Sequence, residues 1–180
     1  MVTVRRLLLV AATLAALQST WALGAFASSP AGITGAVKRA LLSSPELWAT
    51  INVCNAADQP NTVGVRGAMP GDGQAHDKMY MSFALQYRGA STANRWVDLA
   101  GAKTSWIAVG SGSAARQSGS SFTLVPVSGR RASKFRGVVD FQWRRGTTVL
   151  LAVSRPTTAP HKSLAGADPA GFSSATCLIG

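Results

Sequence analysis

The residues that could carry out hydrolysis are few. The chain has two histidines: His76 stands beside Asp77 in a Pro- and Gly-rich turn, and His161 lies near Ser163 in a late loop. A hydrolase needs a nucleophile, a base and an orienting group held together by rigid elements. No motif brings Asp77, His161 and Ser163 together, and there is no Gly-x-Ser-x-Gly elbow. We therefore expect no catalytic residues, with an envelope-acting metal or Ser/His hydrolase as an alternative.

The sequence gives equally little indication of a metal site or of a pair of catalytic carboxylates. Asp72, His76 and Asp77 are close in sequence and could hold a divalent ion with His161 or Asp168. Asp and Gly, however, are common in turns because they suit turn geometry, and zinc prefers a set of His or Cys ligands. A carboxylate-pair glycosidase has no recognisable pair to use, since the chain contains one glutamate and six scattered aspartates. We expect no metal and no cofactor.

Positive charge is the stronger signal. The chain has 18 Lys and Arg against seven Asp and Glu, and its formal net charge is +11. Residues 114–180 alone contain nine basic and two acidic residues. Such density attracts polyanions, for example wall polymer, anionic lipid or nucleic acid. The predicted binding residues lie in the loop before the strand 135–145 and at the start of that strand: Arg130, Arg131, Lys134 and Arg136. The alternation of this strand predicts that Arg136 and Arg144 face outward.

A second basic pair, Arg144 and Arg145, should lie far from that loop. Ten strand residues span roughly 33 Å, so the two clusters fall at opposite ends of the domain. This separation argues against a sequence-specific nucleic-acid module, which needs a continuous basic surface. A basic surface without a dedicated site, and a protein-interaction or inhibitor module that pairs through an edge strand or loop, remain open.

Tryptophans could stack on sugars, but the strand pattern favours a structural role. Trp143 alternates with Phe141 and Val139, which places it in the core. Tryptophan in a β-sandwich is buried more often than it forms a platform, so we expect the same of Trp48, Trp96 and Trp106.

The two cysteines are Cys54 and Cys177. Two cysteines in an exported chain most often pair with each other. The bond would close a loop of roughly 120 residues and constrain the unfolded chain by about 4–5 kcal/mol in the chain-entropy model. It would tie the two ends of the domain together.

The elements that must position these residues are mostly strands. Period-two alternation is clearest over 79–88 and 135–145, and about nine short strands run from residue 46 to residue 180, among them 122–127 and a last strand over 172–179. The pattern predicts an all-β fold: an antiparallel two-sheet sandwich, immunoglobulin-like in architecture, with a small β-barrel as the alternative. Residues 110–121 are rich in Gly and Ser and should form a mobile loop, and residues 156–171 a long irregular connection.

The beginning of the chain is typical of an export signal. Arg5 and Arg6 precede an uncharged apolar run that ends in Ala25-Phe26-Ala27. We expect residues 1–27 to be a cleaved signal peptide, although an uncleaved membrane anchor is possible. Residues 28–45 form a leader with a short helix capped by Thr34, and residues 46–180 form one domain. The protein should be secreted or associated with the cell envelope.

Three further segments are Ala49-Thr50-Ile51-Asn52-Val53-Cys54, Val65-Arg66-Gly67-Ala68-Met69-Pro70-Gly71, and the stretch 167–177 from Ala167-Asp168-Pro169 to Ala175-Thr176-Cys177. In these segments the chain resembles a group of small secreted proteins of high-GC Gram-positive bacteria. The resemblance implies an exported domain whose two cysteines belong to the shared pattern. It implies no activity, because none is established for that group.

Overall fold

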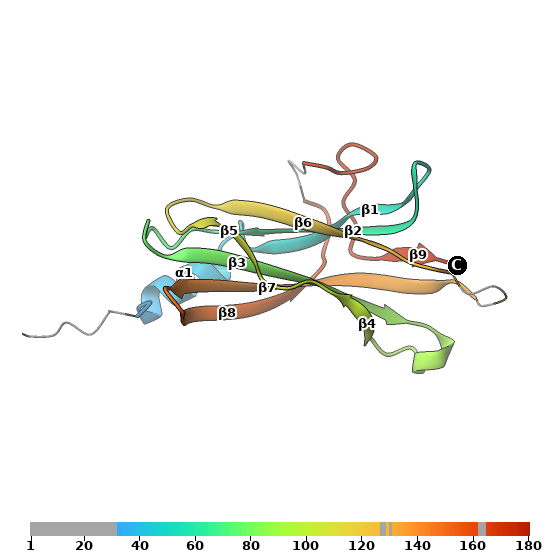
Figure 1. Ribbon diagram of the computed structural model, residues 1–180, viewed down its shortest axis with the longest axis horizontal. Coiled ribbons are helices and arrows are strands. Elements are labelled where there is room, and N and C mark those ends of the chain that lie inside the picture. Colours follow the sequence, from blue (N-terminus) through green and yellow to red (C-terminus); the bar gives the residue numbers. More distant parts are fainter. Residues whose placement is uncertain (1–31, 127–128, 130, 162–164) are drawn as a thin grey trace, which may run out of the picture. The chain divides into compact units, whose positions relative to one another are not determined.

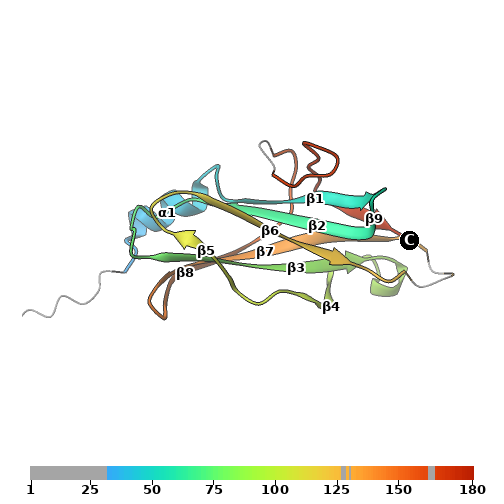
Figure 2. The same ribbon diagram turned by 45° about the horizontal axis from the view of Figure 1, so that its top comes forward.

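The alternating segments pair at the centre of a β-sandwich. The structure is a computed structural model that describes residues 32–126, 129, 131–161 and 165–180. One sheet has the strand order β1-β2-β6, and the other β4-β3-β7-β8, with β5 paired to β3 and β9 paired to β7. Figures 1 and 2 show the two sheets as separate layers. The predicted antiparallel sandwich is confirmed, and the barrel is wrong because the described strands form two sheets that do not close on each other.

One helix and nine strands make up the described fold. The elements are α1 (Gly35–Ser43), β1 (Trp48–Ala56), β2 (Gln59–Met69), β3 (Lys78–Arg88), β4 (Val97–Lys103), β5 (Ile107–Ser111), β6 (Arg116–Thr123), β7 (Ser133–Arg145), β8 (Thr148–Pro156) and β9 (Cys177–Ile179), with a short 3₁₀ turn at Ala90–Thr92.

The core lies between the two sheets. β3 and β7 pair along their whole length, with Met79 opposite Trp143 and Phe83 opposite Val139. All four of these side chains are fully buried. Burial of each such side chain stabilises the fold by about 1.5–3 kcal/mol. The Trp143 indole N–H donates to the carbonyl of Pro70 at 3.0 Å, so the predicted core position of Trp143 is confirmed.

Strand β6 corrects the sequence-based prediction. Residues 110–121 were expected to form a loop and 122–127 a strand, but β6 runs from Arg116 to Thr123 and pairs with β2. Backbone hydrogen bonds to an already ordered strand outweigh the low β-propensity of Gly and Ser. At Gly119 an added Cβ would lie 2.9 Å from the carbonyl oxygen of Val65, so the close approach of the two backbones favours glycine there.

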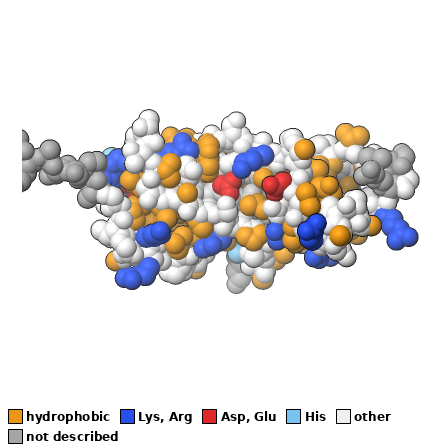
Figure 3. Space-filling model, turned by 90° about the horizontal axis from the view of Figure 1, so that it is seen from below, with side chains coloured by type: hydrophobic (Ala, Val, Ile, Leu, Met, Phe, Trp, Pro, Cys, Tyr) orange, Lys and Arg blue, Asp and Glu red, His pale blue; other side chains and the backbone are white. Residues whose placement is uncertain are grey.

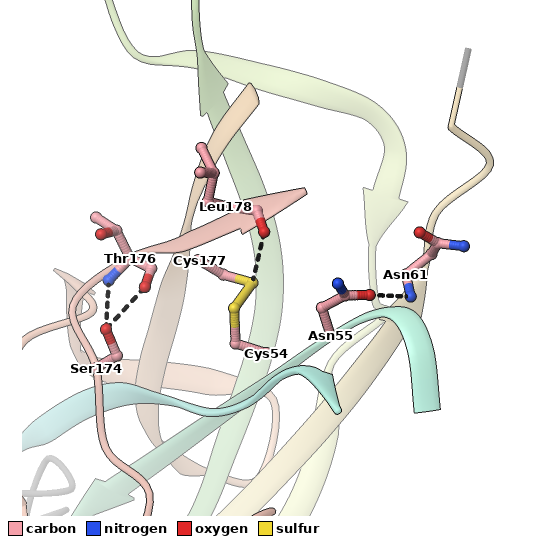
Figure 4. Close-up of a disulfide and its surroundings, with 7 residues drawn as sticks. All are labelled: Cys54, Asn55, Asn61, Ser174, Thr176, Cys177 and Leu178. Carbon is pink, nitrogen blue, oxygen red and sulfur yellow. Dashed lines mark hydrogen bonds between the residues drawn. A yellow bond between two sulfur atoms is a disulfide. The ribbon is translucent and has the colours of Figure 1, made fainter. Parts of the chain in front are cut away.

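The predicted disulfide is present and joins the two sheets. Cys54 on β1 and Cys177 on β9 have an S–S distance of 2.02 Å and a Cα–Cα distance of 5.5 Å. Figure 4 shows the bond beside the β1–β2 hairpin, where the side-chain oxygen of Asn55 accepts the N–H of Asn61 at 2.6 Å. The ends of the domain are therefore tied together, as the spacing of the cysteines indicated.

The helix predicted within the leader is also found. Thr34 is its N-cap, and the side-chain oxygen of Thr34 accepts the N–H of Val37 at 3.3 Å. Leu41 is buried, and Arg155 on β8 donates to the carbonyl of Leu42 at 3.1 Å. A cation at the carbonyl end of a helix satisfies groups that have no partner within the helix.

The last strand is shorter than predicted. It was expected over 172–179 but covers only Cys177–Ile179. The segment before it is irregular, as expected, and is attached by isolated bridges from Ser174 to Ile51 and from Asp168 to Val53. The predicted signal peptide, residues 1–27, lies outside the described residues. Within the described part of the chain, no helix has the length and apolar character needed to cross a membrane.

Candidate functional site

The first catalytic candidate, Asp77, has a structural partner. Its carboxylate is fully buried and is held by Arg145 in a two-pronged pair, with Nε–Oδ1 2.8 Å and Nη2–Oδ2 2.9 Å. The hydrogen bonds from Arg145 hold the pKa of Asp77 below its usual range. His76 is mostly exposed, and its Nε2 lies 3.4 Å from Asp77 Oδ1. Asp77 is therefore occupied as an ion-pair partner.

Asp72 completes this corner of the molecule. Its Oδ1 accepts the N–H of Gln74 at 3.0 Å, whereas its Oδ2 is buried without a hydrogen-bond partner. Burial raises the pKa of Asp72, and the neighbouring Asp77 carboxylate raises it further. Gly112 packs so closely that a Cβ there would collide with the Asp72 carboxylate. Among the described residues, no group of three or more His, Cys, Asp or Glu is arranged to hold a metal ion.

The second histidine has other neighbours. The His161 ring stacks on Trp48 with a centroid distance of 4.6 Å, and His161 Nε2 lies 2.9 Å from the hydroxyl oxygen of Thr158. Burial lowers the pKa of His161. Ser163 lies outside the described residues. No hydrogen bond or ion pair joins His161 to Asp77 among the residues described, so the imagined hydrolase arrangement gains no support.

The predicted basic loop is divided by the fold. Arg130 lies outside the described residues, and Arg131 is exposed and lines shallow hollows near Tyr87 and Ser133. Lys134 and Arg136, by contrast, belong to β7 and alternate with buried Phe135. These two side chains therefore face outward from the six-stranded sheet.

Pairing with β3 extends this outward surface. Lys134 lies opposite Arg88, Arg136 opposite Gln86, and Arg144 opposite Lys78. Residues directly opposite each other in a sheet share a face. The two basic clusters lie at opposite ends of β7, as expected, but Lys134 and Arg136 share one face of the sheet with Arg144, which their separation along the sequence does not indicate. We call it the arginine–aromatic face: Lys78, Tyr80, Gln86, Arg88, Trp96, Asp98, Lys103, Trp106, Lys134, Arg136, Asp140, Gln142 and Arg144.

At one end of this face, two arginines converge on Trp96. The guanidinium carbons of Arg88 and Arg136 lie 4.8 Å and 4.5 Å from the centre of the Trp96 ring. Arg136 Nε also donates to the side-chain oxygen of Gln86 at 2.8 Å, and the Gln86 amide donates to Asp98 at 2.8 Å. Burial lowers the pKa of Arg136, and the charge of Arg88 lowers it further. Two like charges are thus held close together by an aromatic ring.

The other end repeats the arrangement with Arg144. Its guanidinium carbon lies 4.2 Å from the centre of the Tyr80 ring and 5.1 Å from that of Trp106. Arg144 Nε donates to the side-chain oxygen of Gln142 at 2.7 Å. Trp106 is 39% exposed. Cation–π contacts of this kind contribute about 0.5–1 kcal/mol at exposed sites and hold the guanidinium in place.

The middle of the face contains an ion pair, the one that the described residues of this face form with each other. Lys103 Nζ lies 3.1 Å from Asp140 Oδ2, and the hydroxyl of Ser154 donates to Asp140 Oδ1. Within the described part of the chain, the remaining cations of the face form no ion pair with a carboxylate: Lys78, Arg88, Lys134, Arg136 and Arg144. From the side where β8 and β4 lie in Figure 1, basic side chains spread among hydrophobic ones, and acidic ones appear only near the middle (Figure 3).

The tryptophans divide differently from the prediction. Trp143 is buried, but Trp106 is exposed and Trp96 is half-buried beneath two arginines, so the expected core position is wrong for both. Neither belongs to an alternating strand: Trp96 precedes β4, and Trp106 lies between β4 and β5. The outward direction of the β7 arginines follows from the alternation of that strand, whereas their aromatic partners come from β3 and from segments that flank β4.

Comparison with protein-family models, with curated proteins and with solved structures finds no match to this chain. The geometry described above is therefore the basis for any proposal about function.

Proposed function

We propose that this protein is an exported, non-catalytic binding domain whose arginine–aromatic face holds an anionic polymer of the cell envelope. The observation that carries the proposal is the set of five cations on one sheet face without a carboxylate partner among the described residues. Uncompensated charge on one surface attracts polyanions and raises their local concentration.

Aromatic support favours an extended ligand on this face. Arg88 and Arg136 are fixed against Trp96, and Arg144 against Tyr80 and Trp106. Side chains held in place lose less rotamer entropy on binding. Arg136 and Arg144 are eight residues apart on one strand, roughly 26 Å, so only a polymer or a long oligomer engages both ends.

Export is supported by the disulfide between Cys54 and Cys177, because such bonds persist in oxidising compartments. The start of the chain has the pattern of an export signal, which is consistent with export and favours the cell envelope as the place where the protein acts. Wall polymers are the anionic partners at hand in that compartment.

The test is sedimentation of the purified, disulfide-bonded protein with isolated Gram-positive cell walls, before and after the anionic polymers are stripped, over a salt series. We expect binding that needs the polymers and weakens with salt. The variant Arg88→Gln/Arg136→Gln/Arg144→Gln should lose it. A matched control, Lys38→Gln/Arg39→Gln/Arg116→Gln, removes three exposed cations elsewhere and should retain it. An equal loss of wall binding in both variants would mean that net charge alone determines binding. That result would contradict a dedicated arginine–aromatic face.

A lipid surface is the second candidate, favoured by one observation at the end of the domain. Val125 is 90% exposed beside an apolar hollow of about 230 Å³ whose lining includes Leu99, Leu124, Phe135 and Arg131. Vesicles with and without anionic lipid test this candidate, using the variant Val125→Ser. Vesicle binding that Val125→Ser abolishes would favour the lipid candidate over wall polymer.

A further inference from the structure

A groove beside Trp106 distinguishes one end of the arginine–aromatic face from the other. It has a volume of about 360 Å³, and its lining includes Trp106, Asp140, Gln142, Ala152, Val153 and Ser154, all of them described residues on or beside β7 and β8. Ligand pockets range from about 300 to 1,000 Å³, so this groove has room for a small ring and little more.

Trp106 gives the groove an aromatic wall. Its side chain is 39% exposed, one of the largest hydrophobic side chains left open to solvent among the described residues. Arg144 lies over the ring and holds it in place. An aromatic face is electron-rich, and the axial C–H groups of a sugar ring are apolar with a small positive charge, so the two surfaces are complementary.

The polar groups at the rim are mostly donors. The side-chain oxygen of Gln142 accepts from Arg144 Nε, and no described residue accepts from the Gln142 amide nitrogen. The terminal nitrogens of Arg144 likewise have no acceptor among the described residues. Asp140, the one carboxylate, is already bonded by Ser154 and Lys103. A neutralised carboxylate beside open donors favours a ligand that brings its own negative charge.

A planar carboxylate fits these donors well. A guanidinium presents N–H groups as a rigid fork that matches two carboxylate oxygens. The Trp96 end lacks this combination, since its ring already holds two guanidiniums, Arg88 and Arg136. That end offers charge, and the Trp106 end offers charge together with a surface for a ring.

We propose that the groove beside Trp106 is a subsite for one uronic acid residue of an anionic glycan: the pyranose ring packs on Trp106, and its carboxylate accepts hydrogen bonds from Arg144 and Gln142. This inference rests on the proposed function, because it names the class of polymer that the arginine–aromatic face selects.

Two probes of equal charge separate the subsite from the rest of the face: an oligogalacturonate, which has rings and carboxylates, and a linear polyphosphate, which has charge without sugar rings. Affinities are measured by calorimetry at fixed salt. For Trp106→Leu we expect about a tenfold loss of affinity for oligogalacturonate and less than a twofold change for polyphosphate. Trp106→Tyr keeps an aromatic surface and should recover most of the loss.

Trp96→Leu is the matched control, because it also removes an indole beneath arginines but leaves the groove intact. It should weaken both probes to the same small extent. Near-ultraviolet circular dichroism checks that each variant is folded. Equal effects of Trp106→Leu on the two probes, or none on either while both still bind, would overturn the subsite and leave the proposed function standing. Failure of the wild-type protein to bind either probe would overturn both.

Discussion

Arg144 and Arg145 are neighbours on β7, yet they belong to two regions with opposite electrostatics. Arg145 is joined to buried Asp77 by two hydrogen bonds, in a corner that also contains Asp72. Arg144 lies over Tyr80 and Trp106 and pairs with no described carboxylate. Charge density along the sequence therefore does not identify a binding surface. What matters is whether the fold supplies each cation with a carboxylate or with an aromatic ring.

The largest effect that we expect is a loss of stability when the Asp77–Arg145 pair is removed. Asp77→Ala removes a fully buried carboxylate and leaves Arg145 without this partner. Loss of one member of a buried pair costs about 3–5 kcal/mol, and the partial exposure of Arg145 reduces this to roughly 2–3 kcal/mol. Urea unfolding at neutral pH measures the loss. The folded variant should bind the polymer with unchanged affinity. A large drop in the affinity of a fully folded Asp77→Ala protein would contradict the separation of this corner from the arginine–aromatic face.

The next largest effect is a loss of polymer affinity when a cation of the arginine–aromatic face is removed. Arg144→Gln removes a cation that makes no described ion pair but contacts two aromatic rings, so the free energy of unfolding should fall by about 1 kcal/mol, less than for Asp77→Ala. Affinity for an anionic polymer should fall by about tenfold or more, because a hydrogen bond to a charged group is worth about 1.5–3 kcal/mol. Parallel unfolding and binding measurements on Arg144→Gln and Asp77→Ala should therefore give opposite patterns. Loss of stability without loss of affinity in Arg144→Gln would refute the assignment of Arg144 to the face.

The two carboxylates of the corner, Asp77 and Asp72, should affect stability in opposite ways as the pH changes. The pKa of Asp77 is lowered by Arg145, so the stability that this pair contributes is present above the unfolded pKa of about 4 and is lost as the pH falls through the folded pKa. The pKa of Asp72 is raised by burial, so its ionisation opposes folding above its folded pKa, and this cost disappears in acid. Asp72→Asn should therefore increase stability at pH 7 and have no such effect at pH 3. A decrease at pH 7 would show that the ionised Asp72 carboxylate stabilises the corner.

The smallest effect that we expect is a small loss of polyanion affinity when the Trp96 ring, which lies beneath Arg88 and Arg136, is removed. Trp96→Leu removes two cation–π contacts, each worth about 0.5–1 kcal/mol at exposed sites. Affinity for any polyanion should fall about threefold, because Arg88 and Arg136 remain but are no longer held. A stopped-flow salt series detects such a change in the dissociation rate. An unaltered rate would mean that the arginines are positioned by the sheet alone.

Much of the fold was predictable from local patterns. Alternation identified β3 and β7, the spacing of two cysteines identified the disulfide, and Thr34 identified the helix cap. The Gly- and Ser-rich strand β6 was missed because its pairing with β2 depends on backbone contacts that leave little trace in side-chain type.

The candidate site was only half predictable. The outward direction of Arg136 and Arg144 followed from the alternation of β7. Their rings come from β3 and from segments flanking β4, so only the register between strands brings them together. Asp77 could not be paired with Arg145 from sequence for the same reason, since 68 positions separate the two.

The most direct test of the central claim is the salt dependence of polyphosphate binding by three proteins: the wild type, Arg88→Gln/Arg136→Gln/Arg144→Gln, and Lys38→Gln/Arg39→Gln/Arg116→Gln. We expect a steep fall of affinity with salt for the wild type and the second variant. The first variant should bind more weakly and with a shallower salt dependence, because three of the five unpaired cations of the face have been removed. Equal affinities and equal salt slopes for the two variants would contradict a dedicated arginine–aromatic face.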